Sequence, residues 1–164
     1  MIRRLNSKDK LKFLAYCERK DSFADFYVTK NNNRLFLSDL KVAETIFWDI
    51  MKRADVCYVS EDKNEFNGIL LVVGYADKAP RKYIKILSNT VKIADGLIRV
   101  LFWNCPATYF FKIKKENPLI ALTRKYRFQY IGNRGYEILF NKKIEIKDFN
   151  RNANRNYSEH YNKD

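Results

Sequence analysis

An uninterrupted apolar run near the middle of the chain, Ile69-Leu70-Leu71-Val72-Val73, limits the folds that this sequence can form. A run of this length next to polar segments predicts a buried strand. Further strands are predicted before and after it, at residues 56–60 and 83–87, and the second alternates basic with apolar residues. The run therefore belongs to a sheet, and we expect the chain to be built around that sheet.

Helical periodicity appears on both sides of these strands. Apolar residues at three- and four-residue steps predict an amphipathic helix over residues 38–54. A second helix is predicted to begin at Leu97, after a loop at residues 91–96, and to end before Pro106. A short helix is predicted over residues 117–126, because it opens with Asn-Pro, a favourable N-cap and first turn.

The remaining elements complete an α+β pattern. Residues 1–5 predict a short strand and residues 128–140 a hairpin, whereas the three asparagines at 31–33 predict a loop. Residues 1–143 are expected to form one domain of ordinary size. Residues 144–164 are polar and rich in asparagine, which predicts a flexible tail or an arm that orders on a partner.

Several classes of site are disfavoured. The three cysteines, Cys17, Cys57 and Cys105, are far apart, and the one histidine, His160, lies in the tail. This pattern argues against a disulfide framework, a zinc site and a histidine-based triad. No apolar run approaches the ~20 residues of a membrane span, and the N-terminus lacks the apolar core of a signal peptide, so we expect a cytoplasmic protein.

The positive charge is concentrated in one part of the sequence. The net charge is +13, and residues 78–134 carry 13 basic but only 2 acidic side chains. A field of this kind attracts polyanions. The candidate partners are nucleic acid, an acidic protein surface and a phosphate-rich cofactor, and the alternative is a solvated basic surface.

The segment from Asn117 to Phe128 carries the strongest resemblance to a known family. With the hairpin that follows, Asn117-Pro118-Leu119-Ile120-Ala121-Leu122-Thr123-Arg124-Lys125-Tyr126-Arg127-Phe128 resembles the helix "N-x-x-A-x-x-L-Y-E-K-x-G-F" of the GNAT (Gcn5-related) N-acetyltransferases, with one residue missing. The order of predicted elements over residues 1–143 is also similar to that of this family. The resemblance implies a mixed central sheet of about six to seven strands, flanked by about four helices.

The same resemblance implies a site for acetyl-CoA or another acyl-CoA. The family's phosphate-binding loop, Q/R-x-x-G-x-G/A, aligns with Val91, Lys92, Ile93, Ala94, Asp95 and Gly96. Amides at a helix N-terminus favour such an anion, whereas the carboxylate of Asp95 opposes it. Ile86 and Leu87 would end the strand that pairs with pantetheine, and Asn117 would help to hold the pantetheine arm. Cations proposed for the 3′-phosphate are Lys92, Arg99, Arg124 and Arg127.

The catalytic residues that the resemblance implies are less well matched. The family's acidic tyrosine aligns with Thr123, whose hydroxyl is a poorer acid. A carboxylate would remove the amine proton, and Glu61 is the first candidate, with Asp62, Glu65 and Asp77 as others. Tyr83, on the neighbouring strand, is a further candidate.

The sequence leaves two functional interpretations open. The first is an acyl-CoA-dependent N-acyltransferase that transfers acetyl to an amine, with an acceptor that the basic excess would place on or near nucleic acid. The second is a protein of the same fold without catalysis, with a role in an assembly such as a phage virion or in binding nucleic acid. The departures at Asp95 and Thr123 favour the second, and the overall resemblance favours the first.

Overall fold

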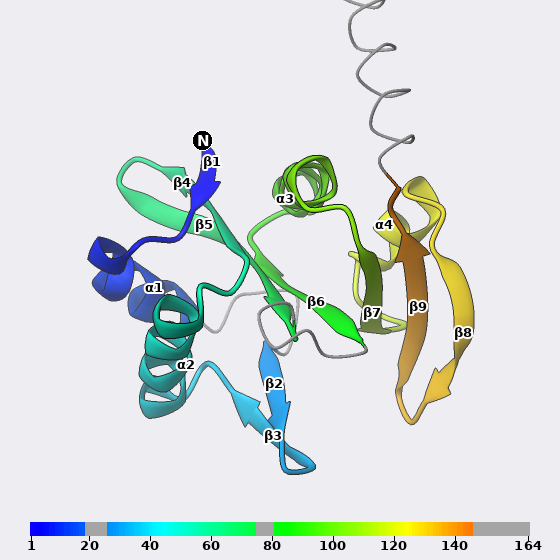
Figure 1. Ribbon diagram of the computed structural model, residues 1–164, viewed down its shortest axis with the longest axis horizontal. Helices are drawn as coiled ribbons and strands as arrows, with labels where there is room; N and C mark the ends of the chain where they lie inside the picture. The colour runs from blue at the N-terminus through cyan, green and yellow to red at the C-terminus, as the bar shows by residue number, and fades with distance from the viewer. Residues whose placement is uncertain (19–25, 75–80, 146–164) are drawn as a thin grey trace, which may run out of the picture.

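The computed structural model of the chain describes residues 1–18, 26–74 and 81–145. Its main sheet contains seven strands in the order β1-β4-β5-β6-β7-β9-β8 (Figure 1). The strands are β1 (Ile2–Arg4), β4 (Cys57–Asp62), β5 (Glu65–Val73), β6 (Lys82–Ser88), β7 (Thr108–Lys114), β8 (Gln129–Arg134) and β9 (Glu137–Lys143). The buried run at residues 69–73 lies in β5, so the predicted central strand and the predicted α+β class are confirmed.

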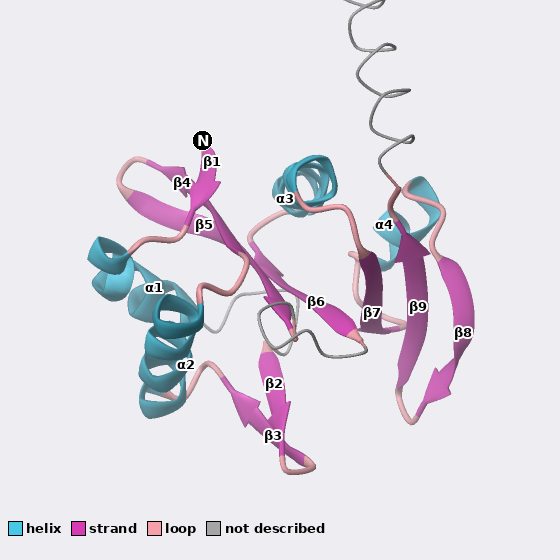
Figure 2. Cartoon of the chain, viewed as in Figure 1, coloured by secondary structure: helices cyan, strands magenta, loops and turns pink. Residues whose placement is uncertain are grey.

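Helices cover both faces of this sheet (Figure 2). One face packs against α3 (Val91–Asn104) and α4 (Ile120–Lys125), and the other packs against α1 (Lys10–Cys17), preceded by the 3₁₀ turn η1 (Ser7–Asp9), and α2 (Leu40–Arg53). The apolar stripe of α2 places Ala43, Phe47 and Ile50 in the core, as its periodicity predicts. Each face of the sheet therefore has its own apolar core.

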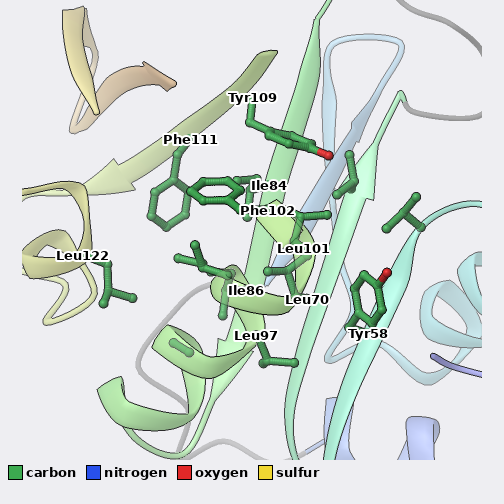
Figure 3. Packing of buried hydrophobic residues seen from close by; sticks show 14 of the residues in the cluster. Tyr58, Leu70, Ile84, Ile86, Leu97, Leu101, Phe102, Tyr109, Phe111 and Leu122 are labelled. Atoms are coloured by element: carbon green, nitrogen blue, oxygen red, sulfur yellow. The ribbon is translucent and has the colours of Figure 1, made fainter. Parts of the chain in front are cut away.

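The core beneath α3 is built from β-strand residues that alternate with those of the opposite face. Ile84 and Ile86 of β6 face α3, with Leu97 and Leu101 from the helix itself (Figure 3). Leu87, one residue further on, belongs to the core of the α1 and α2 face. Successive side chains of a strand point to opposite faces, so Tyr83 and Lys85 lie on the face of Leu87, away from α3.

One predicted loop needs correction, and another lies in a hairpin that the sequence did not predict. Residues 91–96 are not a loop, because α3 begins at Val91, where Thr90 acts as the N-cap and accepts a hydrogen bond from the amide of Ile93 (3.1 Å). The predicted loop at residues 31–33 is confirmed at Asn31 and Asn32, which form the turn of a separate hairpin, β2 (Tyr27–Lys30) and β3 (Asn33–Phe36). Its two-residue turn has φ of 53° at Asn31 and 64° at Asn32, which asparagine tolerates better than most residues.

The predicted domain ends close to where the described chain ends. Ile144, one residue beyond the predicted boundary, is buried, and its amide donates to the carbonyl of Ala107 at 2.9 Å. The tail beyond residue 145 lies outside the described residues, as does Asp77. None of the described helices is long and apolar enough to span a membrane.

Candidate functional site

The pairing between β6 and β7 is short, and this feature defines the candidate site. The two strands are parallel and pair over three residues only, from Lys82 with Tyr109 to Ile84 with Phe111. Beyond Ile84, β6 pairs with β5 alone, and beyond Phe111, β7 pairs with β9 alone. The backbone edge of β6 at residues 85–88 is therefore not used by β7.

Helix α3 begins at the end of this free edge. The turn between β6 and α3 is fixed, because Ser88 Oγ donates to the carbonyl of Thr90 (2.9 Å) and the amide of Asn89 donates to the carbonyl of Asn67 (2.9 Å). By helix geometry, the first amides of α3, on Val91 and Lys92, have no carbonyl one turn back to bond. These amides form the N-terminus of the helix, where the positive end of the helix dipole favours a bound anion.

Gly68 of β5 allows α3 to approach the sheet closely. A Cβ atom at this position would lie 2.5 Å from Ile93 Cγ2 and 3.0 Å from Leu97 Cδ1. Ala94 is fully buried in the core, and a Cβ at Gly96 would lie 3.0 Å from Ile2 Cδ1. The small residues predicted to admit a phosphate therefore serve the packing of α3 on the sheet.

Replacing Gly68 by Ala is expected to lower the free energy of unfolding by about 1–3 kcal/mol, because Ile93 is attached too close to the helix backbone to move aside cheaply. Chemical denaturation measures the loss. Gly132→Ala is a matched control, since its added Cβ would meet only Arg134 Nη1, at 3.2 Å, the end of an adaptable side chain. Equal losses for the two variants would show that Gly68 has no special role.

Asp95 does not face the start of α3 as an unpaired charge. Its carboxylate pairs with Lys125 and accepts a hydrogen bond from the Tyr126 hydroxyl, and Arg99 lies 3.9 Å away. Burial would raise the pKa of Asp95, but the hydrogen bonds from Lys125 and Tyr126 outweigh it, so the pKa is lowered. Burial and then the hydrogen bond to Asp95 raise the pKa of Tyr126 to about 12. Asp95 thus ties α3 to the end of α4.

The two residues predicted from the α4 motif have structural partners. Asn117 caps the turn before α4, where its Oδ1 accepts from the amide of Leu119 at 2.9 Å. Thr123 is buried, and its hydroxyl donates to the carbonyl of Ile120 at 2.6 Å. A threonine hydroxyl committed to its own helix is poorly placed to donate a proton to a leaving group.

Glu61 lies at the other edge of the sheet, away from β7. Its carboxylate bonds Arg3 at 3.0 Å and also pairs with Lys12. Hydrogen bonds from Lys12 and Arg3 lower the pKa of Glu61. Asp62 and Glu65 are exposed at the nearby β4–β5 turn. The structure therefore separates these carboxylates from the point where β6 and β7 part.

Tyr83 is the one predicted catalytic residue that the structure places at this point among the described residues. It packs against Phe110 of β7, with ring centroids 5.7 Å apart. The ammonium groups of Lys85 and Lys112 lie 6.0 and 5.8 Å from the centroid of its ring. Tyr83 therefore belongs to a polar group on the face opposite α3.

Sequence reasoning missed the rest of this group. The anion cluster, as we name it, consists of Tyr27 and Arg34 of the β2–β3 hairpin, Tyr83 and Lys85 of β6, Lys112 of β7 and Glu137 of β9. Tyr27 Oη donates to both Glu137 oxygens at 2.6 and 2.8 Å, and Arg34 lies 3.0 Å from Glu137. The signal in the sequence that could have pointed to this group is Lys85, a charged residue inside a predicted strand.

Comparison with solved structures identifies proteins that share this architecture. An N-acetyltransferase from Staphylococcus aureus Mu50 matches with a TM-score of 0.63 and 14% identity, over 88% of this chain and 98% of that one. An acetyltransferase of the GNAT family from Streptococcus pneumoniae matches with a TM-score of 0.59 and 14% identity, over 88% and 99%. The chain has the GNAT fold.

The predicted fold is thereby confirmed. A third GNAT-fold structure, yncA of Salmonella typhimurium with its cofactor acetyl-CoA, has a TM-score of 0.63 at 11% identity, over 89% of this chain and 94% of that one. No family model matches the sequence, and no curated protein matches it. Within the described part of the chain, no group of three or more His, Cys, Asp or Glu side chains could hold a metal ion.

Proposed function

We propose that the protein is an acyl-CoA-dependent N-acyltransferase that uses acetyl-CoA. The observation that carries this proposal is the early end of pairing between β6 and β7, beside the start of α3. The free edge at residues 85–88 suits the amide groups of a pantetheine arm, and the first amides of α3 suit its pyrophosphate. The solved GNAT-fold structure with acetyl-CoA supports the choice of cofactor.

The chemistry requires positioning more than covalent participation by the protein. The nitrogen of the acceptor amine forms a bond to the thioester carbonyl carbon while the carbon–sulfur bond breaks. The proton that the amine loses ends on the departing thiolate. Backbone amides near Leu87 would polarise the carbonyl, and Tyr83 is the side chain best placed to relay the proton.

The cations proposed for the 3′-phosphate also fit this site. Lys92 and Arg99 project from α3, and Arg124 from α4, and all three are exposed. Arg127 follows α4 in a left-handed conformation, with φ of 55°. A nucleic-acid partner remains a prediction from charge alone, and retention on DNA that falls with salt would support it.

Saturating acetyl-CoA is expected to raise the melting temperature. At about 100 times its dissociation constant it contributes about 2.7 kcal/mol, which corresponds to roughly 5–10 °C for a chain of this size. Differential scanning fluorimetry measures the shift, with 3′-dephospho-CoA as a control for the cations. Absence of any shift up to millimolar acetyl-CoA would contradict the proposed cofactor site.

A further inference from the structure

The anion cluster has more positive than negative side chains. Three cations, Arg34, Lys85 and Lys112, surround one carboxylate, Glu137. Both oxygens of that carboxylate accept from Tyr27, and one also bonds Arg34. Glu137 is 5% exposed, so it has little capacity for further partners.

Lys85 and Lys112 form no direct ion pair with a carboxylate of the described residues, although the charge of Glu137 acts on Lys85 from a distance. Their ammonium groups contact aromatic rings instead. Lys85 Nζ lies 4.3 Å from the ring centroid of Tyr27, and both lysines approach the ring of Tyr83. An ammonium group that is partly removed from water and close to another cation is costly unless an anion joins it.

The position of this charge bears on the proposed reaction. Lys85 directly follows Ile84, the last residue of β6 that pairs with β7. It lies on the face of Leu87, whereas α3, whose first amides are proposed to bind the pyrophosphate, packs on the other face. A ligand held by Lys85 and Lys112 would therefore approach the free edge of β6 from the side opposite the pyrophosphate.

We propose that the acceptor is an amine whose molecule also carries a small oxyanion, a carboxylate or a phosphate, which binds against Lys85 and Lys112. This inference rests on the proposed acyl transfer and names the substrate class of the same site. The oxyanion supplies the direct counter-charge that the described residues do not provide, and it holds the amine of the same molecule near the point where β6 and β7 part. A polycationic acceptor would be repelled from this face.

The burial of Lys85 agrees with this assignment. Burial, the largest cause, and then the charge of Lys112 lower the pKa of Lys85 to about 8, while Glu137 acts in the opposite direction. A bound oxyanion would favour the charged ammonium and raise this pKa again. Titration of Lys85 therefore reports on anion binding independently of acyl transfer.

The first experiment compares acceptors of similar size by CoA release. Ethanolamine is the neutral acceptor, β-alanine carries a carboxylate, O-phosphoethanolamine carries a phosphate, and spermidine is the polycation. We expect kcat/KM for at least one anionic amine to exceed that for ethanolamine about tenfold, with spermidine the poorest. The two anionic amines distinguish carboxylate from phosphate. Ethanolamine or spermidine equal to or better than both anionic amines would overturn the proposal.

Variants locate the preference in the cluster. Lys85→Met and Lys112→Met are each expected to lower the ratio of anionic to neutral kcat/KM about tenfold. Lys41→Met is a matched control, because Lys41 is exposed on α2 and is not a member of the cluster. An unchanged ratio in both cluster variants would overturn the proposal.

The second experiment does not need acyl transfer. In protein with lysine labelled at 13Cε, inorganic phosphate and acetate are titrated against the Lys85 signal. A saturable displacement supports an oxyanion site, and no displacement by either anion overturns it. If acetyl-CoA fails to bind while the Lys85 signal responds, the proposed function is wrong and the oxyanion site stands.

Discussion

Replacing Glu137 by Gln is expected to lower the free energy of unfolding by about 3 kcal/mol, since it removes the one carboxylate of the anion cluster, which also contains three cations. The carboxylate accepts from Tyr27 Oη at 2.6 and 2.8 Å, and Tyr27 is itself buried. The side-chain amide of glutamine would direct its N–H group toward Tyr27 and Arg34, which are donors themselves, so one of the present hydrogen bonds would be lost. The ion pair with Arg34 adds little, because that side chain is 51% exposed.

Urea denaturation at pH 7 measures this loss, and amide exchange should show β2 and β3 opening first. Tyr27→Phe removes one hydroxyl and leaves the carboxylate with Arg34, so we expect a smaller loss of about 1–2 kcal/mol. Glu116→Gln is the control, because Glu116 is exposed in the turn after β7. A Glu137→Gln variant as stable as this control would refute the assigned role.

Replacing Lys85 by Met is expected to raise the free energy of unfolding at pH 7 by about 1–2 kcal/mol, although it removes a residue of the proposed acceptor site. Methionine keeps the length of the side chain without the ammonium group, so no charge must be buried. Residues kept for binding often cost stability in this way. A loss of stability would show that the ammonium group is already well paired.

The pH dependence of this gain follows from the lowered pKa. The folded protein releases the Lys85 proton near pH 8, whereas the unfolded chain keeps it until about pH 10.5. Wild-type stability therefore recovers as the pH rises through this interval, since the unfolded state then binds more protons. The advantage of Lys85→Met should be constant below pH 8 and should shrink between pH 8 and 10.

Urea denaturation of the wild type and of Lys85→Met, repeated at half-unit steps of pH, measures this difference in stability. Among the described residues, the charged and titratable groups that face Lys85 are Tyr27 and Arg34 of the hairpin, Tyr83, Lys112 and Glu137. All five are present in both proteins, so the difference between the two curves reports on Lys85 and its interactions with these groups. A difference that does not change with pH would refute the titration of this residue.

Local patterns were sufficient where a residue's role depends on its neighbours in sequence. The apolar stripe predicted α2, and the buried run predicted β5, because side-chain periodicity follows the geometry of each element. The start of α3 is also a local feature: Thr90, an ordinary N-cap residue, begins the helix at Val91, ahead of the small residues at 94 and 96 that suggested a loop. The Asn31-Asn32 turn was an equally local signal of the β2–β3 hairpin.

The sequence by itself determined the α+β class, the buried central strand and the basic excess. Only the tertiary structure decided where β6 and β7 stop pairing, and that Tyr27 reaches Glu137 across 110 positions of the chain. The physical reason is that periodicity records which side of an element is apolar, but not which elements meet there. The charge balance around Lys85 depends on charged side chains from four separate strands, β3, β6, β7 and β9, and so it exists only in the folded chain.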